Sequence, residues 1–171
     1  MVLDVLDAGN WAVSEGLAKS GGVCVMGASY GGYSALMSAI HGPEKVGCSI
    51  SINGVTDPIE SMTEYGTEST AMAYWELYMG DYWSTSKSDK AQITPFDRAR
   101  DIRAATLLIH GREDTVVPVG QSRALAKKID NRANARYVEI DGDDHQLART
   151  TSRVKVLEET LAFLQEHHPA R

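Results

Sequence analysis

Gly27-Ala28-Ser29-Tyr30-Gly31 is the stretch of sequence that decides the fold, because it joins a short apolar run at residues 23–26 to a helical pattern at residues 30–40. A serine with glycines two positions before and after it, at a strand-to-helix junction, is typical of a strained turn that exposes its hydroxyl at the carboxyl end of a sheet. The glycines leave room for the neighbouring chain and for an approaching molecule. The pattern therefore predicts a reactive Ser29 rather than a chance match in a structural turn.

On both sides of this turn, short apolar runs alternate with helical patterns. Continuous apolar runs are typical of strands that are covered on both faces, and their alternation with helices predicts right-handed crossovers and a mainly parallel sheet. The predicted fold class is therefore α/β. The expected strands are residues 23–26, 46–52, 106–109 and 136–140, and the expected helices are residues 3–18, 30–40, 70–79, 119–129 and 150–166.

A serine hydroxyl is a weak nucleophile at neutral pH, so a reactive serine needs a histidine base and a carboxylate that orients it. Asp114 follows the third expected strand, and His145 follows the fourth. The carboxyl ends of parallel strands meet at one edge of the sheet, where Ser29 is also expected. The order Ser, Asp, His is that of the α/β-hydrolases, and the backbone N–H of Tyr30 is placed to hold an oxyanion.

Other titratable residues lie next to these candidates and offer alternatives. Glu113, next to Asp114 in the sequence, is the alternative candidate for the orienting carboxylate. Asp143 and Asp144 stand beside the histidine and are expected to be solvated loop charges. His110, at the end of a strand, is expected to be a core histidine whose hydrogen bonds are satisfied.

At these residues the sequence resembles the catalytic domain of prolyl oligopeptidase-like serine peptidases, a family that includes dipeptidyl and acylaminoacyl peptidases. The resemblance covers nearly the whole chain and is carried by Gly27-Ala28-Ser29-Tyr30-Gly31-Gly32-Tyr33, by His110-Gly111-Arg112-Glu113-Asp114 with residues 116–118, and by Asp144-His145. It implies an α/β-hydrolase-like fold. It also implies Ser29 as nucleophile, Asp114 as orienting carboxylate, His145 as general base and the Tyr30 amide as one oxyanion donor.

The resemblance further implies a substrate pocket. Tyr30, Val55 and Val116 are expected to border the site for the residue before the scissile bond, with Tyr78-Met79-Gly80 nearby. Residues 54–95 are read as a pocket or lid insertion within a single catalytic domain, 1–171. The aromatic residues in this insertion are divided evenly between core packing and pocket wall: Tyr65, Tyr74, Trp75, Tyr78, Tyr82 and Trp83.

The chain also departs from the family. Family members have further strands upstream, one connection of which supplies a second oxyanion donor, and a β-propeller usually comes first. The four strands expected here resemble only the second half of that sheet. The strand at Val23 should then have a bare edge through which copies of the chain could associate. Loss of one oxyanion donor typically costs about 2.7 to 4 kcal/mol of transition-state stabilisation.

Composition narrows the partners and the location. The 171 residues include 17 basic and 23 acidic side chains, a formal net charge of −6, which argues against nucleic acid and membrane surfaces as partners. No apolar run reaches the length of a membrane span, and Asp4 stands where a signal peptide would be basic. Cys24 and Cys48 are expected to be free, buried thiols, which predicts a cytoplasmic location. No cluster has metal-ligand spacing.

These observations predict a serine hydrolase that cleaves peptide bonds in short peptides through an acyl-enzyme and without a cofactor. A small-ester carboxylesterase is the first alternative. The second is a truncated fragment with weak or no activity.

Overall fold

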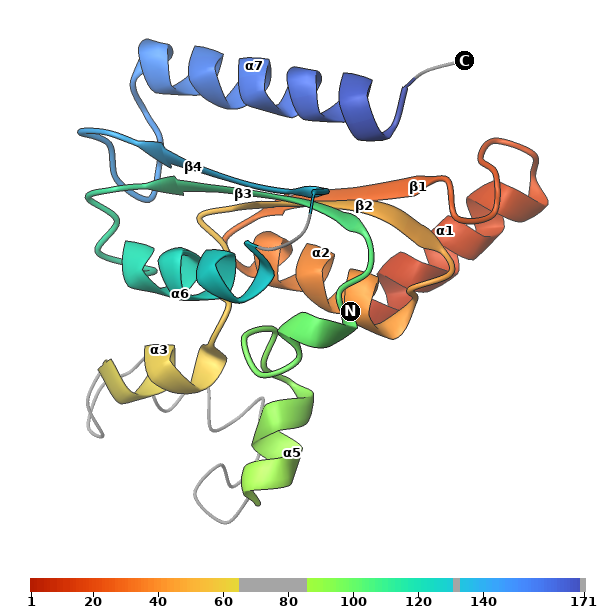
Figure 1. Cartoon of the computed structure of the whole chain (residues 1–171), viewed down its shortest axis with the longest axis horizontal. Helices are drawn as coiled ribbons and strands as arrows, with labels where there is room; N and C mark the ends of the chain where they lie inside the picture. The colour runs from red at the N-terminus through yellow and green to blue at the C-terminus, as the bar shows by residue number, and fades with distance from the viewer. Residues whose placement is uncertain (65–85, 131–132, 170–171) are drawn as a thin grey trace.

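The computed structural model describes residues 1–64, 86–130 and 133–169, and its centre is a four-stranded sheet (Figure 1). The strand order is β1-β2-β3-β4, and each neighbouring pair is parallel, which confirms the predicted α/β class. The strands are β1 (Val23–Ala28), β2 (Val46–Ile52), β3 (Ala105–Gly111) and β4 (Ala135–Ile140).

Helices cover both faces of the sheet. Because the strand order runs in one direction, right-handed crossovers put α2 and α6 on the same face, where α1 also lies, and α7 returns across the other face (Figure 1). The described residues of the connection from β2 to β3 form two short α-helices and a 3-10 helix. The helices are α1 (Val2–Ser14), α2 (Tyr30–His41), α3 (Pro58–Glu64), α5 (Lys87–Gln92), η1 (Ala99–Asp101), α6 (Val119–Ile129) and α7 (Thr150–His167).

One expected helix ends earlier than predicted, and another expected helix and the aromatic cluster lie outside the described residues. The first helix ends at Ser14 rather than at residue 18, because Gly16 takes the left-handed conformation with a φ of 70° and the chain turns there. The helix expected at 70–79 and the aromatic cluster between Tyr65 and Trp83 lie outside the described residues.

The described residues form one apolar core cluster on each face of the sheet. The cluster beneath α1, α2 and α6 includes Leu36, Leu108 and Leu125, and the cluster beneath α7 includes Ile50 and Phe163. Strands β2 and β3 are almost wholly buried, as expected for central strands with helices on both sides.

Cys24 and Cys48 form a disulfide between β1 and β2, so the prediction of two free thiols is wrong. The two residues are direct partners in the register of these strands, with a Cα–Cα distance of 4.5 Å, which lies within the range that a disulfide can span. The sequence alone could not give this pairing, because it depends on the register between two strands.

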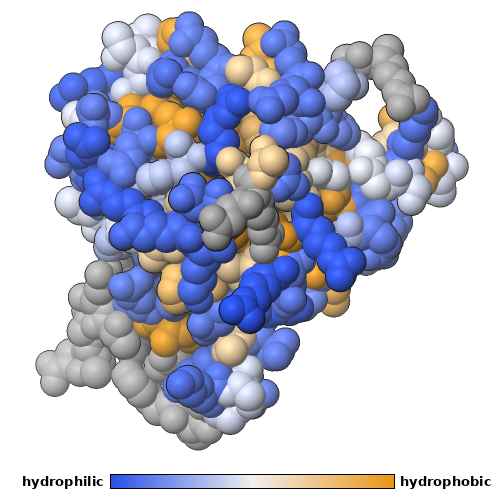
Figure 2. Space-filling view, in the orientation of Figure 1, coloured by the Kyte–Doolittle hydropathy of each residue, from blue (hydrophilic) through white to orange (hydrophobic). Residues whose placement is uncertain are grey.

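The β1 edge leaves apolar side chains exposed. Within the described ranges β1 pairs with β2 alone, and Met26 on β1 is 49% exposed. Three large apolar residues of α7 are exposed as well: Val154, Leu157 and Leu161. Hydrophilic residues otherwise cover most of the face seen in Figure 2, with apolar residues in patches. No helix in the described part of the chain is long and apolar enough to cross a membrane.

Candidate active site

Ser29 occupies a strained turn between β1 and α2. Its φ of 56° lies in the left-handed region, which is costly for a residue with a side chain, and its N–H donates to the Ile52 carbonyl at 2.9 Å. A Cβ on Gly27 would collide with the carbonyl of Gly31, so the turn requires glycine at position 27. Tyr30 begins α2, so its N–H belongs to the first turn of the helix, which has no intrahelical acceptors.

The structure brings Ser29, His145 and Asp114 together at the carboxyl edge of the sheet. His145 Nε2 lies 3.1 Å from Ser29 Oγ, and His145 Nδ1 lies 2.7 Å from Asp114 Oδ2. A carboxylate only accepts hydrogen bonds, so the proton of a neutral imidazole belongs on Nδ1. Nε2 is then free to accept the Ser29 hydroxyl proton.

Asp114 is held ionised in a buried setting. Burial alone would raise the pKa of its carboxyl group, but hydrogen bonds with His110 and His145 and from two backbone amides keep the pKa below its ordinary value. The two amides, of Val116 and Val117, both donate to Oδ1 at 2.8 Å. Its rival Glu113 is exposed, so Asp114 is the carboxylate that meets the histidine.

His110 is the satisfied core histidine that the sequence predicts. Its side chain is fully buried, with Nε2 2.8 Å from the Val117 carbonyl and Nδ1 2.7 Å from Ser122 Oγ. The carbonyl can only accept, so Nε2 carries the proton and the Ser122 hydroxyl donates to Nδ1. Nε2 also lies 3.3 Å from Asp114 Oδ2, on the same oxygen that contacts His145.

The prediction that Asp143 and Asp144 are solvated loop charges is wrong for Asp143. It is only 6% exposed, whereas Asp144 is exposed as expected. A hydrogen bond with Ser152, together with backbone N–H groups that include those of Asp144 and Arg149, lowers the pKa of the Asp143 carboxyl group. Asp143 therefore joins the His145 loop to the start of α7, a contact that no local sequence pattern indicates.

The predicted pocket residues differ in exposure. Tyr30 and Val116 are 39% and 45% exposed, and Val55 is 7% exposed. A common pocket for these three side chains stays a prediction.

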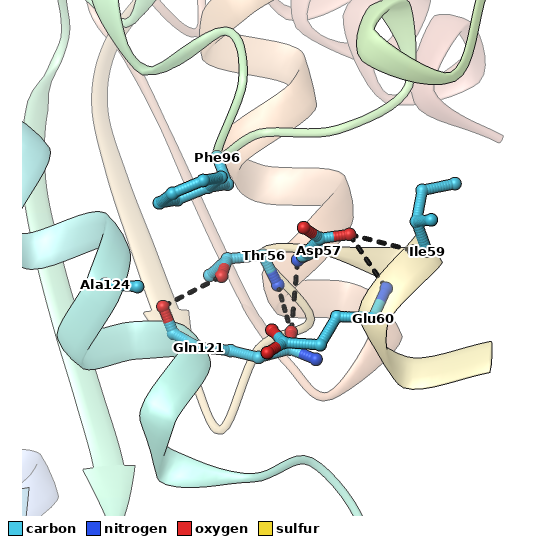
Figure 3. A pocket seen from close by; sticks show the side chains of 7 residues that line it. All are labelled: Thr56, Asp57, Ile59, Glu60, Phe96, Gln121 and Ala124. Carbon is cyan, nitrogen blue, oxygen red and sulfur yellow. Dashed lines mark hydrogen bonds between the residues drawn. The ribbon is translucent and has the colours of Figure 1, made fainter. Parts of the chain in front are cut away.

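A hollow of about 350 Å³ is lined in part by the residues that come directly after Val55 in the sequence. Figure 3 shows its lining residues. The buried Gln121 side chain holds one side of it: Oε1 accepts from the backbone N–H groups of Thr56 and Asp57, and Nε2 donates to Ser61 Oγ. Gln121, which the sequence did not single out, thus fixes the segment after β2 to α6. The hollow is lined by Thr56, Asp57, Ile59, Glu60, Phe96, Gln121 and Ala124.

A second hollow, of about 360 Å³, lies between the His145 loop and α7. Ala28 and Ile52 contribute from the ends of β1 and β2, and Val156 and Leu157 contribute from α7. Asn53, also in this lining, is a further residue that sequence reasoning missed. The Asn53-Gly54 pair is a turn signal that could have drawn attention to it.

Metal ligands do not gather in the described part of the chain. There, no group of three or more His, Cys, Asp or Glu residues is placed to hold a metal ion.

A parallel sheet with a serine on a strained turn, next to a histidine that also contacts an aspartate, is the arrangement of the α/β-hydrolase class. Within that class the chain belongs to the prolyl oligopeptidase family of serine-type peptidases, whose family model matches residues 1–170. The family resemblance read from the motifs is thereby confirmed.

Individual relatives agree with this membership. Dipeptidyl aminopeptidase BIII of Pseudoxanthomonas mexicana is 27% identical over 172 residues, which cover 95% of this chain and 24% of the relative. Dipeptidyl peptidase family member 6 of Caenorhabditis elegans is 42% identical over 59 residues, or 34% of this chain and 8% of the relative.

Solved structures agree on the fold. A puromycin-hydrolysing peptidase of Mycobacterium tuberculosis superposes with a TM-score of 0.88 at 24% identity, over 99% of this chain and 25% of that one. The chain thus spans about a quarter of the length of this structure and of the bacterial relative.

Proposed function

We propose that the protein is a serine hydrolase that cleaves peptide bonds in short peptides through an acyl-enzyme on Ser29. The observation that carries this proposal is the His145 ring, which lies 3.1 Å from the Ser29 hydroxyl and 2.7 Å from the Asp114 carboxylate. Family membership and the dipeptidyl aminopeptidase relative favour peptides as the substrate class.

The proposed chemistry uses only these side chains and water. His145 Nε2 takes the hydroxyl proton as Ser29 Oγ bonds to the substrate carbonyl carbon, and the carbonyl electron pair moves to the oxygen. That oxyanion rests on the Tyr30 N–H, where the N-terminal dipole of α2 adds stabilisation. When the carbonyl re-forms, the bond to the amine breaks and the imidazolium gives its proton to the amine. Water, deprotonated by His145, then releases the acyl group and restores Ser29.

We also propose that Tyr30, Val55 and Val116 border the pocket for the acyl side of the substrate, with residues 54–95 contributing to it. Support comes from their attachment to the site: Tyr30 follows Ser29, and the N–H of Val116 donates to Asp114 at 2.8 Å. The Gln121 bonds to Thr56 and Asp57 hold the chain directly after Val55.

Hydrolysis of small esters is the second candidate activity. It is favoured by the exposure of Tyr30 and Val116, which leaves the region beside Ser29 open to small acyl groups. Rates on a series of dipeptidyl-p-nitroanilides and on p-nitrophenyl esters of acetate and butyrate separate the two. A higher kcat/KM on the anilides supports the peptidase, and turnover of the esters alone supports the esterase.

A fluorophosphonate probe tests the hydrolase itself, because it bonds covalently to an activated serine. We expect labelling of the wild-type protein, none of Ser29→Ala, and undiminished labelling of Ser88→Ala, which changes an exposed serine on α5. A wild-type chain that is neither labelled nor active would overturn the proposal and support the alternative of an inactive fragment.

Self-association through the edge of β1 is a further proposal about partners. Its support is the single strand neighbour of β1 among the described residues, together with the exposed Met26. Nucleic acid and membranes are not proposed as partners, since the formal net charge is −6.

The cytoplasmic location stays a prediction, and the Cys24–Cys48 disulfide argues against it, because disulfides persist mainly in oxidising compartments. Thiol alkylation and mass spectrometry on protein taken directly from its native cells measure the state of the pair. Free thiols support the cytoplasm, and a bonded pair contradicts it.

A further inference from the structure

Asn53 is a buried residue outside the proposed catalytic set, and its backbone conformation is unusual. It directly follows β2, is 1% exposed and has a φ of 46°. Among residues with a side chain, asparagine is one of the few that enter the left-handed region readily, and Gly54 follows it. A buried position in this conformation, with a polar side chain, calls for a specific set of hydrogen bonds.

The Asn53 side chain joins two loops of the site. Its Oδ1 accepts a hydrogen bond from the Gly111 N–H at 2.8 Å, and its Nδ2 donates to the His145 carbonyl at 2.9 Å. A longer contact of 3.4 Å runs from Nδ2 to the Asp144 carbonyl. Gly111 ends β3, just before the loop that carries Asp114. One buried amide therefore holds the loops of the proposed base and of its carboxylate.

The backbone beside Asn53 reaches the third loop. The Asn53 N–H donates to the Ile109 carbonyl at 2.8 Å, and the preceding residue, Ile52, accepts from the Ser29 N–H at 2.9 Å. Residues 52 and 53 thus contact the Ser29 turn, the end of β3 and the His145 loop.

We propose that Asn53 is a positioning residue that sets the place of the His145 imidazole between Ser29 and Asp114. The inference deepens the proposed function and rests on it, since positioning matters only where the imidazole is the base. Misplacement of a reacting group by about 1 Å can cost about a hundredfold in rate. The His145 ring has short contacts on both sides, so a shift of the loop that carries it is expected to lengthen at least one of them.

Asn53→Asp is the sharpest variant. It keeps the size of the side chain, the tolerance of the left-handed conformation and the oxygen that accepts from Gly111. With its carboxyl group ionised, it places an oxygen in front of the His145 carbonyl where the wild type has an NH₂ group, so attraction becomes repulsion. We expect the rate constant of fluorophosphonate bonding to fall about a hundredfold, with the constant for reversible probe binding unchanged.

A second readout separates positioning from a general loss of structure. The proton between His145 Nδ1 and Asp114 gives a low-field ¹H resonance in protein labelled with ¹⁵N-histidine, and we expect Asn53→Asp to shift or broaden it. Asn134→Asp is the matched control, because its amide also donates to a backbone carbonyl, that of Arg103 at 3.3 Å, in the loop before β4. The control should keep both the labelling rate and the resonance.

Asn53→Gly serves if the aspartate variant does not fold, because glycine keeps the left-handed turn and removes the amide. Slower labelling together with a changed resonance in either variant supports the inference. A wild-type rate, or a lost rate with an unchanged resonance, overturns it. If the wild-type chain is not labelled, the proposed function fails, and the resonance alone decides whether Asn53 holds His145.

Discussion

The carboxyl edge of the sheet and the outer side of β1 with α7 are built in opposite ways. At the carboxyl edge, short polar bonds connect segments that are far apart in the sequence, such as Ser29 to Ile52 and Asn53 to His145. At the β1 side, Met26 and Leu161 leave apolar surface exposed. Directional hydrogen bonds fix geometry, whereas an exposed apolar surface only favours being covered. The first region is therefore the place of the proposed chemistry, and the second region is the place of the proposed contacts with a second copy of the chain.

The largest expected effect comes from a substitution of Asp114, at the carboxyl edge of the sheet. Asp114→Asn replaces an acceptor by an amide of the same shape, so the His145 ring loses the partner that keeps the proton on Nδ1. We expect the rate of fluorophosphonate labelling to fall about 10⁴-fold. Glu113→Gln, which changes the exposed neighbouring carboxylate, should leave the rate unchanged. An equal loss in the Glu113 variant would show that the wrong carboxylate has been assigned.

The next largest effect is expected on the buried side of α7, compared with its exposed side. Phe163 is fully buried against the sheet, whereas Leu161, two residues earlier, is 58% exposed. Phe163→Ala should lower the free energy of unfolding by about 3 to 5 kcal/mol, because it leaves a cavity. Leu161→Ala should change it by less than about 0.5 kcal/mol. Urea denaturation followed by circular dichroism measures both, and similar losses would contradict the packing of α7 described above.

The contrast between these regions also explains what could be predicted from the sequence. The four strands, the helices α1, α2, α6 and α7, and the Ser29 turn follow from local patterns. The positions of Ser29, Asp114 and His145 after predicted strands suffice to place them at one edge. The role of Asn53 was not predicted because its partners Gly111 and His145 are 58 and 92 residues away in the sequence. The Cys24–Cys48 bond was not predicted for the same reason, because strand register depends on the whole fold. The Asp143 contact with the Arg149 N–H spans only six residues, but no local sequence pattern indicates it.

The Cys24–Cys48 disulfide links the edge strand β1 to β2, so its removal shows how much this link stabilises the protein. Closing a loop with a sequence separation of 24 is expected to stabilise the protein by roughly 3 kcal/mol, by restricting the unfolded chain. Reduction should therefore lower the free energy of unfolding in urea by about that amount. The double variant Cys24→Ala, Cys48→Ala should no longer respond to reductant. Equal free energies of unfolding for the oxidised and reduced wild-type protein would show that the disulfide does not stabilise the fold.

A smaller effect is expected from a polar cluster on β4. Glu139 accepts hydrogen bonds from Arg123, Tyr137 and Arg112. The Arg123 bond contributes most to lowering the pKa of the Glu139 carboxyl group from 4.5 to about 2. A lowered pKa means that the stabilisation is present above the unfolded pKa and is lost as pH falls from about 4.5 to about 2.

Glu139→Gln should therefore lower the free energy of unfolding at pH 7 by about 1 kcal/mol and have less effect near pH 2. Thermal unfolding of both proteins across this range measures the difference. A gap in Tm that stays constant from pH 7 to pH 2 would contradict a role for the ionised carboxylate.

The smallest effect on stability is expected at the β1 edge itself, where Met26→Lys adds a charge to an exposed side chain. Because Met26 is 49% exposed, the free energy of unfolding should change by less than about 0.5 kcal/mol. Self-association should weaken strongly, since charged residues on edge strands oppose edge-to-edge pairing. Sedimentation equilibrium over a range of concentrations measures this, with Lys87→Met on the exposed helix α5 as the opposite change elsewhere. A wild-type chain that stays monomeric at the highest concentration would show that the open edge does not pair with a second copy.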